Sequence, residues 1–363
     1  KIINQKVEKF SKDVNCKRIS NKYNILLTGA TGFFGSHLLA ELLNNTDQIK
    51  NIYCAVRPRK NISAKDRLLK KMKFYFKDIY NELFDKYVKV IECEISEEKL
   101  GLETEIYNEL RNDVDIVIHS AANVKHYGEY TDLEKDNIKA TQNIIDFCKN
   151  SNIKLHYMST MTVSGNYLVK QEIGKEVFDE NIFYIGQNFE DNVYSKSKMI
   201  AESLVIKNID NGLIATIYRL GDLMGRYKDG VFQENINKNA TYLRLKSILE
   251  IGAIPENILE KQLEFSPVDE VAKAVNTIIW SDKCQNRIFN VYNPNMITTS
   301  ELLNFIEKIN YSVKSISKDT FINLIEKISS DEIKQKKLVG IINDFTDNKD
   351  LVYNYTIEQQ NQI

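Results

Sequence analysis

Three glycines between an apolar run and an amphipathic run constrain this chain more than any other feature. The apolar run YNILL (23–27) is followed by Gly29, Gly32 and Gly35 in a G-x-x-G-x-x-G array. Apolar residues at 38, 39, 42 and 43 then follow with the spacing of one helix face. A strand, a glycine turn and a helix in this order are typical of a site that holds a dinucleotide.

We predict a different role for each glycine. The first permits a tight turn, the second lets the backbone approach a pyrophosphate, and the third lets helix and strand pack closely. The helix start adds free N–H groups and a positive dipole end for the phosphates. The expected dinucleotide contacts therefore begin with Thr28, Gly29, Thr31, Gly32, Phe33, Phe34 and Gly35.

Short apolar runs alternate with longer amphipathic stretches through most of the chain. This alternation predicts an α/β fold, a Rossmann-like doubly wound parallel sheet with crossover helices. The expected strands are 23–27, 52–56, 87–92, 114–119, 153–159, 214–220 and 287–292.

Helical patterns dominate the C-terminal part, at 233–250, 269–280 and 299–309. We expect a helical lead-in over 1–22 and a dinucleotide-binding domain over 23–225, to which the strand near 287–292 returns. The remainder, 226–363, is expected to form a smaller, mostly helical C-terminal substrate domain.

Composition argues against several classes of function. Lys plus Arg number 49 and Asp plus Glu number 50, so the chain is nearly neutral. Its net charge therefore gives no reason to expect a nucleic-acid partner. No run is long and apolar enough to span a bilayer. The five cysteines are scattered without metal-ligand spacing, which favours buried thiols in a reducing compartment. We therefore expect a cytoplasmic protein with no metal, no nucleic-acid partner and no membrane partner.

The end of the second expected strand indicates which dinucleotide is bound. NAD-preferring sites usually end this strand with Asp or Glu, which binds the ribose 2′-hydroxyl. Here the strand ends with Arg57, and further basic residues, among them Arg67, follow. Because a guanidinium makes bidentate bonds to a phosphate, these arginines favour NADPH. Later strand ends are expected to line the same cofactor through Glu94, Ile95, Ser120, Ala121, Ala122 and Leu220, whereas we expect His119 to be structural.

Tyr194 and Lys198 stand four residues apart, so their side chains share one face of an expected helix. A lysine cation beside a phenol stabilises the phenolate, so we expect a lowered pKa for Tyr194 and a role as general acid on a carbonyl oxygen. The fifth strand ends in Thr160, whose hydroxyl can hold the same oxygen. We call Thr160, Tyr194 and Lys198 the catalytic set, and expect Tyr194 and Lys198 also to contact the cofactor.

The glycine array, the hydroxyl after the fifth strand and Tyr-x-x-x-Lys together resemble the extended short-chain dehydrogenase/reductases. Finer segments are similar to the terminal thioester reductase domains of nonribosomal peptide synthetases, and the resemblance covers roughly residues 24–293. These segments are VRP (56–58), KLGLETEIYNEL (99–110), DIVIHSAANVKHYGEY (115–130), FDENIFYIGQNFEDNVYSKSKMIAE (178–202) and FSPVDEVAKAV (265–275). Two positions depart from that family, with Cys93-Glu94 where Gly-Asp is frequent and Lys125 where Asn is common.

The resemblance implies an aminoacyl or peptidyl thioester on the phosphopantetheine arm of a carrier protein. NADPH would reduce the thioester carbonyl while Tyr194 and Thr160 stabilise the oxyanion, and an aldehyde would be released. A second reduction to an alcohol stays open. The chain would then be a monomeric domain of a larger synthetase. For carrier docking we single out 238–246, where Arg244 and Lys246 can meet acidic helices, against the alternative of a solvated helix face.

Three alternatives stay open at this point. A fatty acyl thioester reductase would share the chemistry but would need a long apolar tunnel. An NAD(P)-dependent sugar-nucleotide epimerase or dehydratase would share the fold but would favour NAD and an acid where Arg57 stands. A non-catalytic NADPH-sensing regulator would usually lack the Tyr-x-x-x-Lys pair, which this chain has.

Overall fold

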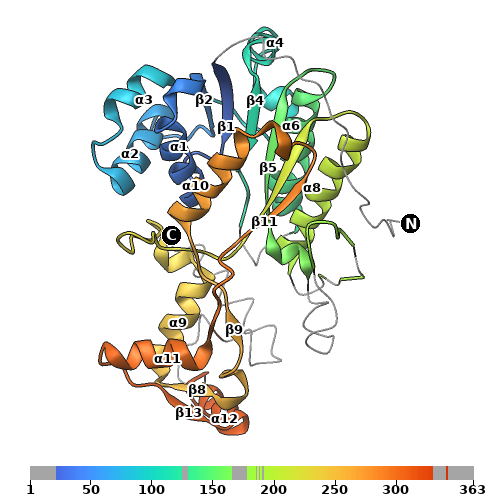
Figure 1. The fold of residues 1–363 in the computed structure, drawn as a ribbon. Coiled ribbons are helices and arrows are strands. Elements are labelled where there is room, and N and C mark those ends of the chain that lie inside the picture. Colours follow the sequence, from blue (N-terminus) through green and yellow to red (C-terminus); the bar gives the residue numbers. More distant parts are fainter. Residues whose placement is uncertain are drawn as a thin grey trace. The chain divides into compact units, whose positions relative to one another are not determined.

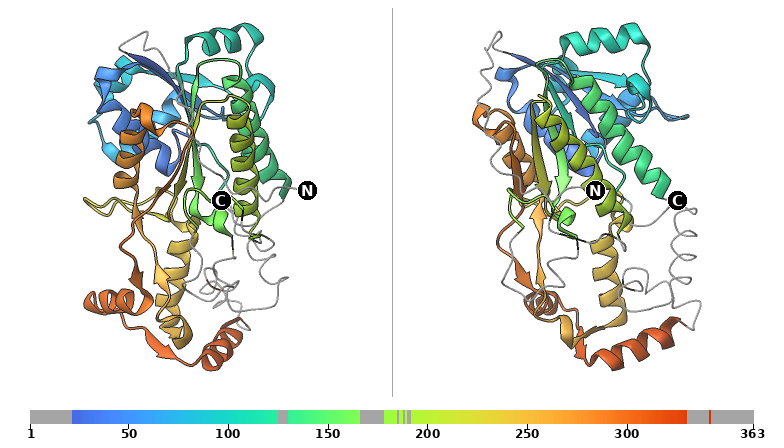
Figure 2. Two further views of the ribbon diagram at one scale, coloured as in Figure 1. Left: turned by 45° about the vertical axis from the view of Figure 1, so that its right-hand side comes forward. Right: turned by 90° about the vertical axis from the view of Figure 1, so that its right-hand side faces the viewer.

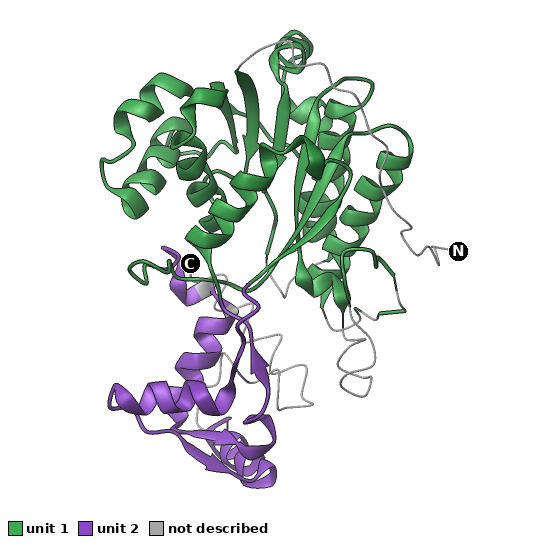
Figure 3. Ribbon diagram, viewed as in Figure 1, with its two compact units in different colours: residues 1–231, 266–292 green, residues 232–265, 293–363 purple. Residues whose placement is uncertain are grey.

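The computed structural model describes residues 22–124, 130–165, 178–184, 186–187, 189, 192–329 and 341. Lys125 and residues 1–21 of the expected lead-in lie outside these residues. The chain divides into two compact units (Figure 3). Unit 1 comprises Lys1–Val231 and Ser266–Tyr292, and unit 2 comprises Phe232–Phe265 and Asn293–Ile363.

Unit 1 is built on a parallel sheet in which the described strands follow the order β11-β6-β5-β4-β1-β2-β3 (Figure 1). Each apolar run that the sequence marked as a strand is a strand of this sheet, and the last run returns to it by pairing with β6. The strands are β1 (Tyr23–Thr28), β2 (Ile49–Val56), β3 (Val88–Glu92), β4 (Ile116–His119), β5 (Lys154–Thr160), β6 (Ala215–Leu220) and β11 (Ile288–Val291).

Helices cover both faces of the sheet, which explains why its strands are apolar without alternation. In β1, Ile25 and Leu27 enter one core while Leu26 enters the other. The first core lies under α1 (Phe33–Leu43), α2 (Ala64–Phe76), α3 (Asn81–Tyr87) and α10 (Val268–Ile279). The second lies under α4 (Thr104–Asp113), α6 (Ala140–Cys148) and α8 (Val193–Asp210), and Figure 2 shows the two layers. The predicted doubly wound sheet is confirmed.

Unit 2 has its own small core, formed by residues that include Ile248, Ile254, Phe321 and Ile325. At the start of α11, Thr298 accepts from the backbone N–H of Glu301, whose carboxylate accepts from the backbone N–H of Thr298, which makes a capping box. The elements are α9 (Ala240–Ile251), α11 (Thr299–Lys308) and α12 (Lys318–Ser329), with β8 (Ala253–Pro255) beside β13 (Lys314–Ile316) and β9 (Gln262–Leu263) beside β12 (Ile297–Thr298).

The boundary between the units differs from the predicted one. The sequence assigned 226–363 to one C-terminal domain, but Ser266–Tyr292 belongs to unit 1. The reason is α10, whose apolar residues Val268, Val271 and Val275 join the core beside α1. A helical pattern shows that a helix has an apolar face but not which core that face joins. The predicted helix at 269–280 is therefore part of the sheet-containing unit.

None of the helices within the described ranges is long and apolar enough to cross a membrane. The same part of the chain holds no group of three or more His, Cys, Asp or Glu side chains that could bind a metal ion.

The start of α1 touches the turn after β1 through a contact that requires glycine. A Cβ on Gly35 would lie 2.1 Å from the carbonyl oxygen of Gly29. Gly29 itself has φ +77°, and a Cβ there would lie 2.6 Å from the backbone N of Ala121. The tight turn expected at the first glycine and the close packing expected at the third are both present in the structure.

We predict that Gly35→Ala lowers the free energy of unfolding by about 3 kcal/mol or more, because backbone must move to admit the methyl group. Gly212→Ala is the control, since Gly212 has φ +95° but no atom within 4 Å of its Cβ position. It should cost only about 1–2 kcal/mol of left-handed backbone strain. Urea unfolding measures both, and equal losses would contradict the contact.

Candidate active site

The carboxyl ends of the parallel strands bring most of the predicted site residues to one edge of the sheet. Thr28 at the end of β1 lies in register with His119 at the end of β4. Thr160 at the end of β5 lies in register with Leu220 at the end of β6. Ligands of open α/β sheets bind outside this edge.

A chain of hydrogen bonds fixes the segment after β4. The backbone N–H of Ala121 donates to Thr28 Oγ1 over 3.1 Å, and Thr28 Oγ1 lies 2.8 Å from His119 Nδ1. On the other side of the ring, His119 Nε2 lies 3.2 Å from Thr141 Oγ1, which donates to the carbonyl of Asn137 over 2.6 Å. Burial lowers the pKa of His119 to about 3, and the charge of Lys198 lowers it further. His119 is therefore a neutral, structural ring, as the sequence indicated.

Asn137, which sequence reasoning missed, links this edge to the helix that carries Tyr194. It is buried in the π-helix η3 (Glu134–Lys139). Its side chain accepts from the backbone N–H of Asn123 over 2.7 Å and donates to the Ser197 hydroxyl over 2.9 Å. Ser197 in turn donates to the carbonyl of Tyr194 over 2.7 Å. An asparagine on the apolar face of an amphipathic stretch is the signal that marks such a residue.

The structure places Thr160 in contact with Tyr194, and Lys198 one turn further along the same helix. Tyr194 and Lys198 lie in the first two turns of α8, whose start is capped by Asn192 accepting from the Ser195 N–H over 3.0 Å. Lys198 is 3% exposed, and its Nζ donates to the Met158 carbonyl over 2.7 Å. Thr160, the last residue of β5, forms a hydrogen bond with the Tyr194 hydroxyl.

The pKa values of this set differ from the prediction. Burial raises the pKa of Tyr194 to about 12, with the hydrogen bond from Thr160 acting in the opposite direction. Burial lowers the pKa of Lys198 to about 7, opposed by the negative charge of Glu202. The sequence predicted that a lysine cation lowers the pKa of the phenol, but desolvation dominates both groups. Tyr194 therefore holds its proton at neutral pH, which is the state that a general acid needs.

The arginines after β2 are more tightly engaged than the sequence suggested. Arg57 is held between two carboxylates, with its Nε 2.7 Å from Glu94 and its Nη2 2.9 Å from Asp136. Arg67 instead donates to the carbonyl of Arg57 over 2.6 Å and to Thr31 Oγ1 over 3.1 Å. Thr31 belongs to the glycine turn, so Arg67 brings positive charge to that turn. Within the described residues, no carboxylate forms an ion pair with Arg67.

Three predicted cofactor residues have buried side chains. The side chains of Phe34 and Leu220 are buried in the core under α1, and that of Ile95 is buried in the core on the other face. Glu94, which was expected near the adenine, is engaged by Arg57 and by the Ser96 hydroxyl over 2.8 Å.

The turn and the start of α1 fit a dinucleotide phosphate. Gly32 occupies the N-cap with no capping side chain, and the first turn of α1 holds no acidic residue, so no carboxylate there opposes the attraction of the positive helix end for an anion. A Cβ on Gly32 would lie 3.1 Å from the Gly29 carbonyl and would fill this cradle. The backbone of Ser120 and Ala121 lies directly beside Gly29, so a Cβ on Gly29 would come within 2.6 Å of both residues.

The chain is similar to known proteins over most of its length. The profile of the NAD-binding family described as "Male sterility protein" matches residues 27–275. A linear gramicidin synthase protein of Brevibacillus parabrevis is 26% identical over 310 residues, which are 85% of this chain and 6% of that protein. The L-2-aminoadipate reductase large subunit of Candida glabrata is 30% identical over 263 residues, 69% of this chain and 19% of that protein. The chain thus spans a small part of these relatives.

Among solved structures, the chain is similar to a thiolation-reductase di-domain from an archaeal nonribosomal peptide synthetase. The TM-score is 0.77 and the identity 30%, over 90% of this chain and 67% of that chain.

The burial of His119 predicts a measurable pH dependence. Its pKa is about 3 in the folded chain against 6.5 in the unfolded one, so between these values only the unfolded chain binds the proton. Stability therefore falls as pH drops, by about 2 kcal/mol between pH 7 and 5 for this group. The His119→Asn variant lacks the titrating ring. Between pH 7 and 5, we therefore expect the free energy of unfolding of this variant to fall by about 2 kcal/mol less than that of the wild type. An unchanged pH dependence in urea unfolding would contradict this reading.

Proposed function

The chain belongs to the NAD-binding family described as "Male sterility protein", and from this premise we propose that it is an NADPH-dependent thioester reductase. Its substrate is an aminoacyl or peptidyl group held as a thioester on the phosphopantetheine arm of a carrier protein. The observation that carries the proposal is the meeting of Thr160, Tyr194 and Lys198 at the carboxyl edge of the sheet. The similarity to a thiolation-reductase di-domain supports the carrier-bound substrate.

The residues of the catalytic set take separate roles in this reaction. When bound, NADPH would supply the hydride for reduction of the thioester carbonyl. The hydroxyls of Thr160 and Tyr194 bind the carbonyl oxygen and stabilise the negative charge that develops on it. Tyr194, with a pKa of about 12, supplies its proton to that oxygen. The hemithioacetal then releases an aldehyde and the carrier thiol.

Lys198 positions the cofactor and does not act as a nucleophile. Its amine is anchored on the Met158 carbonyl over 2.7 Å, which fixes it one turn from Tyr194. From there it holds the nicotinamide ribose, and in its protonated form it adds positive charge beside the developing oxyanion.

NADPH rather than NADH is favoured by Arg67 more than by Arg57. The charge of Arg57 is already balanced by Glu94 and Asp136 at 2.7 and 2.9 Å. Arg67 lies at the glycine turn through Thr31 and keeps its charge available for a 2′-phosphate.

Carrier docking near Arg244 and Lys246 of α9 remains a proposal. Lys246 lies 3.9 Å from Glu250 one turn on, an exposed pair that contributes little stability. A carrier carboxylate can therefore displace Glu250 at small cost.

The alternatives have weaker support. A sugar-nucleotide enzyme with NAD would favour an acid at the end of β2, where Arg57 stands. A sensor without turnover would have no need for a buried lysine and a hydrogen-bonded tyrosine and threonine.

Replacement of the tyrosine tests the catalytic role. We expect Tyr194→Phe to lower kcat for a carrier-bound thioester by about 100-fold or more, with NADPH affinity changed by less than about threefold, because only the proton donor is lost. Tyr227→Phe is the matched control, since Tyr227 is 79% exposed. Thiol release and nucleotide oxidation report turnover. Retained turnover in Tyr194→Phe would overturn the assigned role, and NADPH binding without oxidation by the wild type would favour the sensor.

Cofactor selectivity gives a second prediction. Arg67→Ala should raise KM for NADPH by about tenfold or more and leave KM for NADH nearly unchanged, because only the 2′-phosphate loses a partner. Lys70→Ala removes an exposed positive charge from the same helix and serves as control. A similar rise in KM for both cofactors would show that Arg67 supports the glycine turn and does not bind the 2′-phosphate.

A further inference from the structure

A fully buried ion pair lies behind the catalytic set. Glu202 of α8 and Arg219 of β6 are both 0% exposed. Glu202 Oε1 accepts from Arg219 Nε over 3.0 Å and from Nη2 over 2.6 Å. Its other oxygen, Oε2, accepts from the Ser159 hydroxyl over 2.5 Å. The carboxylate thus joins α8 to two neighbouring strands near their carboxyl ends.

The contacts of Glu202 and Lys198 fix the position of α8 along the direction of β5. Tyr194, Lys198 and Glu202 are spaced by four residues, so they follow one face of the helix. Lys198 donates to the carbonyl of Met158, and Glu202 accepts from Ser159, the next residue of β5. A shift of α8 by one turn, about 5.4 Å, would break both contacts. The residue after Ser159 is Thr160, so the same register sets where Tyr194 meets Thr160.

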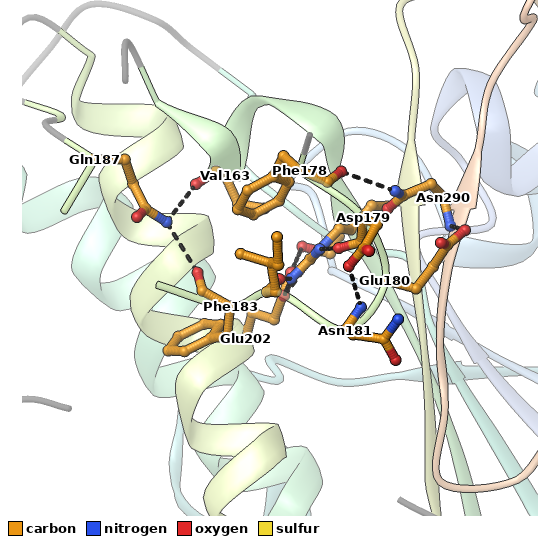
Figure 4. Close-up of polar contacts among 12 residues, drawn as sticks. Val163, Phe178, Asp179, Glu180, Asn181, Phe183, Gln187, Glu202 and Asn290 are labelled. Atoms are coloured by element: carbon orange, nitrogen blue, oxygen red, sulfur yellow. Dashed lines mark hydrogen bonds and ion pairs between the residues drawn. The ribbon is translucent and has the colours of Figure 1, made fainter. Parts of the chain in front are cut away.

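Arg219 also holds the 178–183 segment, which precedes α8 in the chain and of which Figure 4 labels Phe178, Asp179 and Phe183 beside Glu202. Its guanidinium donates to the carbonyl of Asp179 over 3.2 Å and to that of Ile182 over 2.9 Å, and lies 4.5 Å from the centroid of the Phe178 ring. Gln187 donates to the carbonyl of Phe183 over 2.9 Å and to that of Val163, just beyond Thr160, over 3.1 Å. The segment is thus tied to the end of β5 as well as to β6.

The geometry points to more than stability. A buried ion pair costs much of its Coulombic gain in desolvation, and apolar residues of similar volume often stabilise a fold equally well. Yet every donor of the Arg219 fork that the structure records is directed at Glu202 or at the 178–183 segment. We propose that Glu202 and Arg219 are positioning residues that set the register of Tyr194 and Lys198 against Thr160. This inference rests on the proposed reductase function.

The test replaces both charges at once. Glu202→Leu with Arg219→Met removes the pair without leaving a lone buried charge, so the thermal midpoint should stay close to that of the wild type. We expect kcat for a carrier-bound thioester to fall by about tenfold or more, with KM for the thioester changed by less than about threefold, because Tyr194 and Lys198 lose their alignment against Thr160. Retention of kcat within about twofold would overturn the proposal.

The control is a second arginine–carboxylate pair in unit 1, whose arginine is buried and whose carboxylate, on Asp229, is 36% exposed. Arg226 is 7% exposed, and its guanidinium donates to both carboxylate oxygens of Asp229 over 2.9 and 2.8 Å and to the Tyr75 carbonyl over 2.8 Å. Arg226→Met with Asp229→Leu should keep kcat within about twofold. An equal loss of kcat in this control would show that losing an arginine–carboxylate pair remote from Thr160, Tyr194 and Lys198 slows the enzyme as much, and the proposal would fall.

Conservative variants cover the case in which the double variant does not fold. Glu202→Gln keeps an acceptor for the Ser159 hydroxyl, so it should retain more of kcat than Glu202→Leu. Ser159→Ala removes only the hydroxyl contact, and we expect a loss of about threefold to tenfold in kcat with an unchanged thermal midpoint. Unchanged kcat in Ser159→Ala, or equal kcat in the two Glu202 variants, would contradict positioning through this contact.

The outcome is separable from that of the proposed function. If the wild type fails to reduce any carrier-bound thioester, the proposed function is rejected. The position of α8 along β5 can still be tested without substrate. A crystal structure of Ser159→Ala or of the double variant should then show α8 and Tyr194 displaced along β5 relative to the wild type. An undisplaced α8 would overturn the positioning role.

Discussion

The first turn of α1 lies against the carbonyl of Gly29, and the site depends on this contact. A Cβ at position 35 would lie 2.1 Å from that carbonyl oxygen. Because Gly35 has no such atom, the start of α1 can lie directly against the end of β1. Gly29 is pressed in turn against the backbone of Ser120 and Ala121, so the ends of β1 and β4 are fixed together. The N-terminus of α1 and the proposed catalytic residues Thr160, Tyr194 and Lys198 can then face the same ligand.

Desolvation sets the protonation states around this edge. Burial lowers the pKa of His119 to about 3 and that of Lys198 to about 7, and raises that of Tyr194 to about 12. Each shift favours the neutral form, as expected for groups removed from water. Glu202 and Arg219 are also fully buried, but they form an ion pair with each other, with Arg219 Nη2 2.6 Å from Glu202 Oε1.

The features that the sequence predicted well are those recorded in local patterns. The parallel strands follow from short apolar runs, and the shared face of Tyr194 and Lys198 follows from a spacing of four. The features it missed depend on residues far apart in the chain. Arg57 meets Asp136 across 79 positions, and α10 joins the core of α1, so neither has a local signal. The direction of the Tyr194 pKa shift was wrong because it depends on burial, which spacing does not report.

The proposed function requires that the chain reduce a carrier-bound acyl thioester with NADPH. The most direct test supplies the wild type with NADPH and either an aminoacyl thioester on a carrier protein or a nucleotide sugar. We expect nucleotide oxidation only with the thioester, one carrier thiol freed for each acyl group, and an aldehyde or alcohol identified by mass. Oxidation with the sugar, or binding of NADPH without thioester-dependent oxidation, would contradict the account.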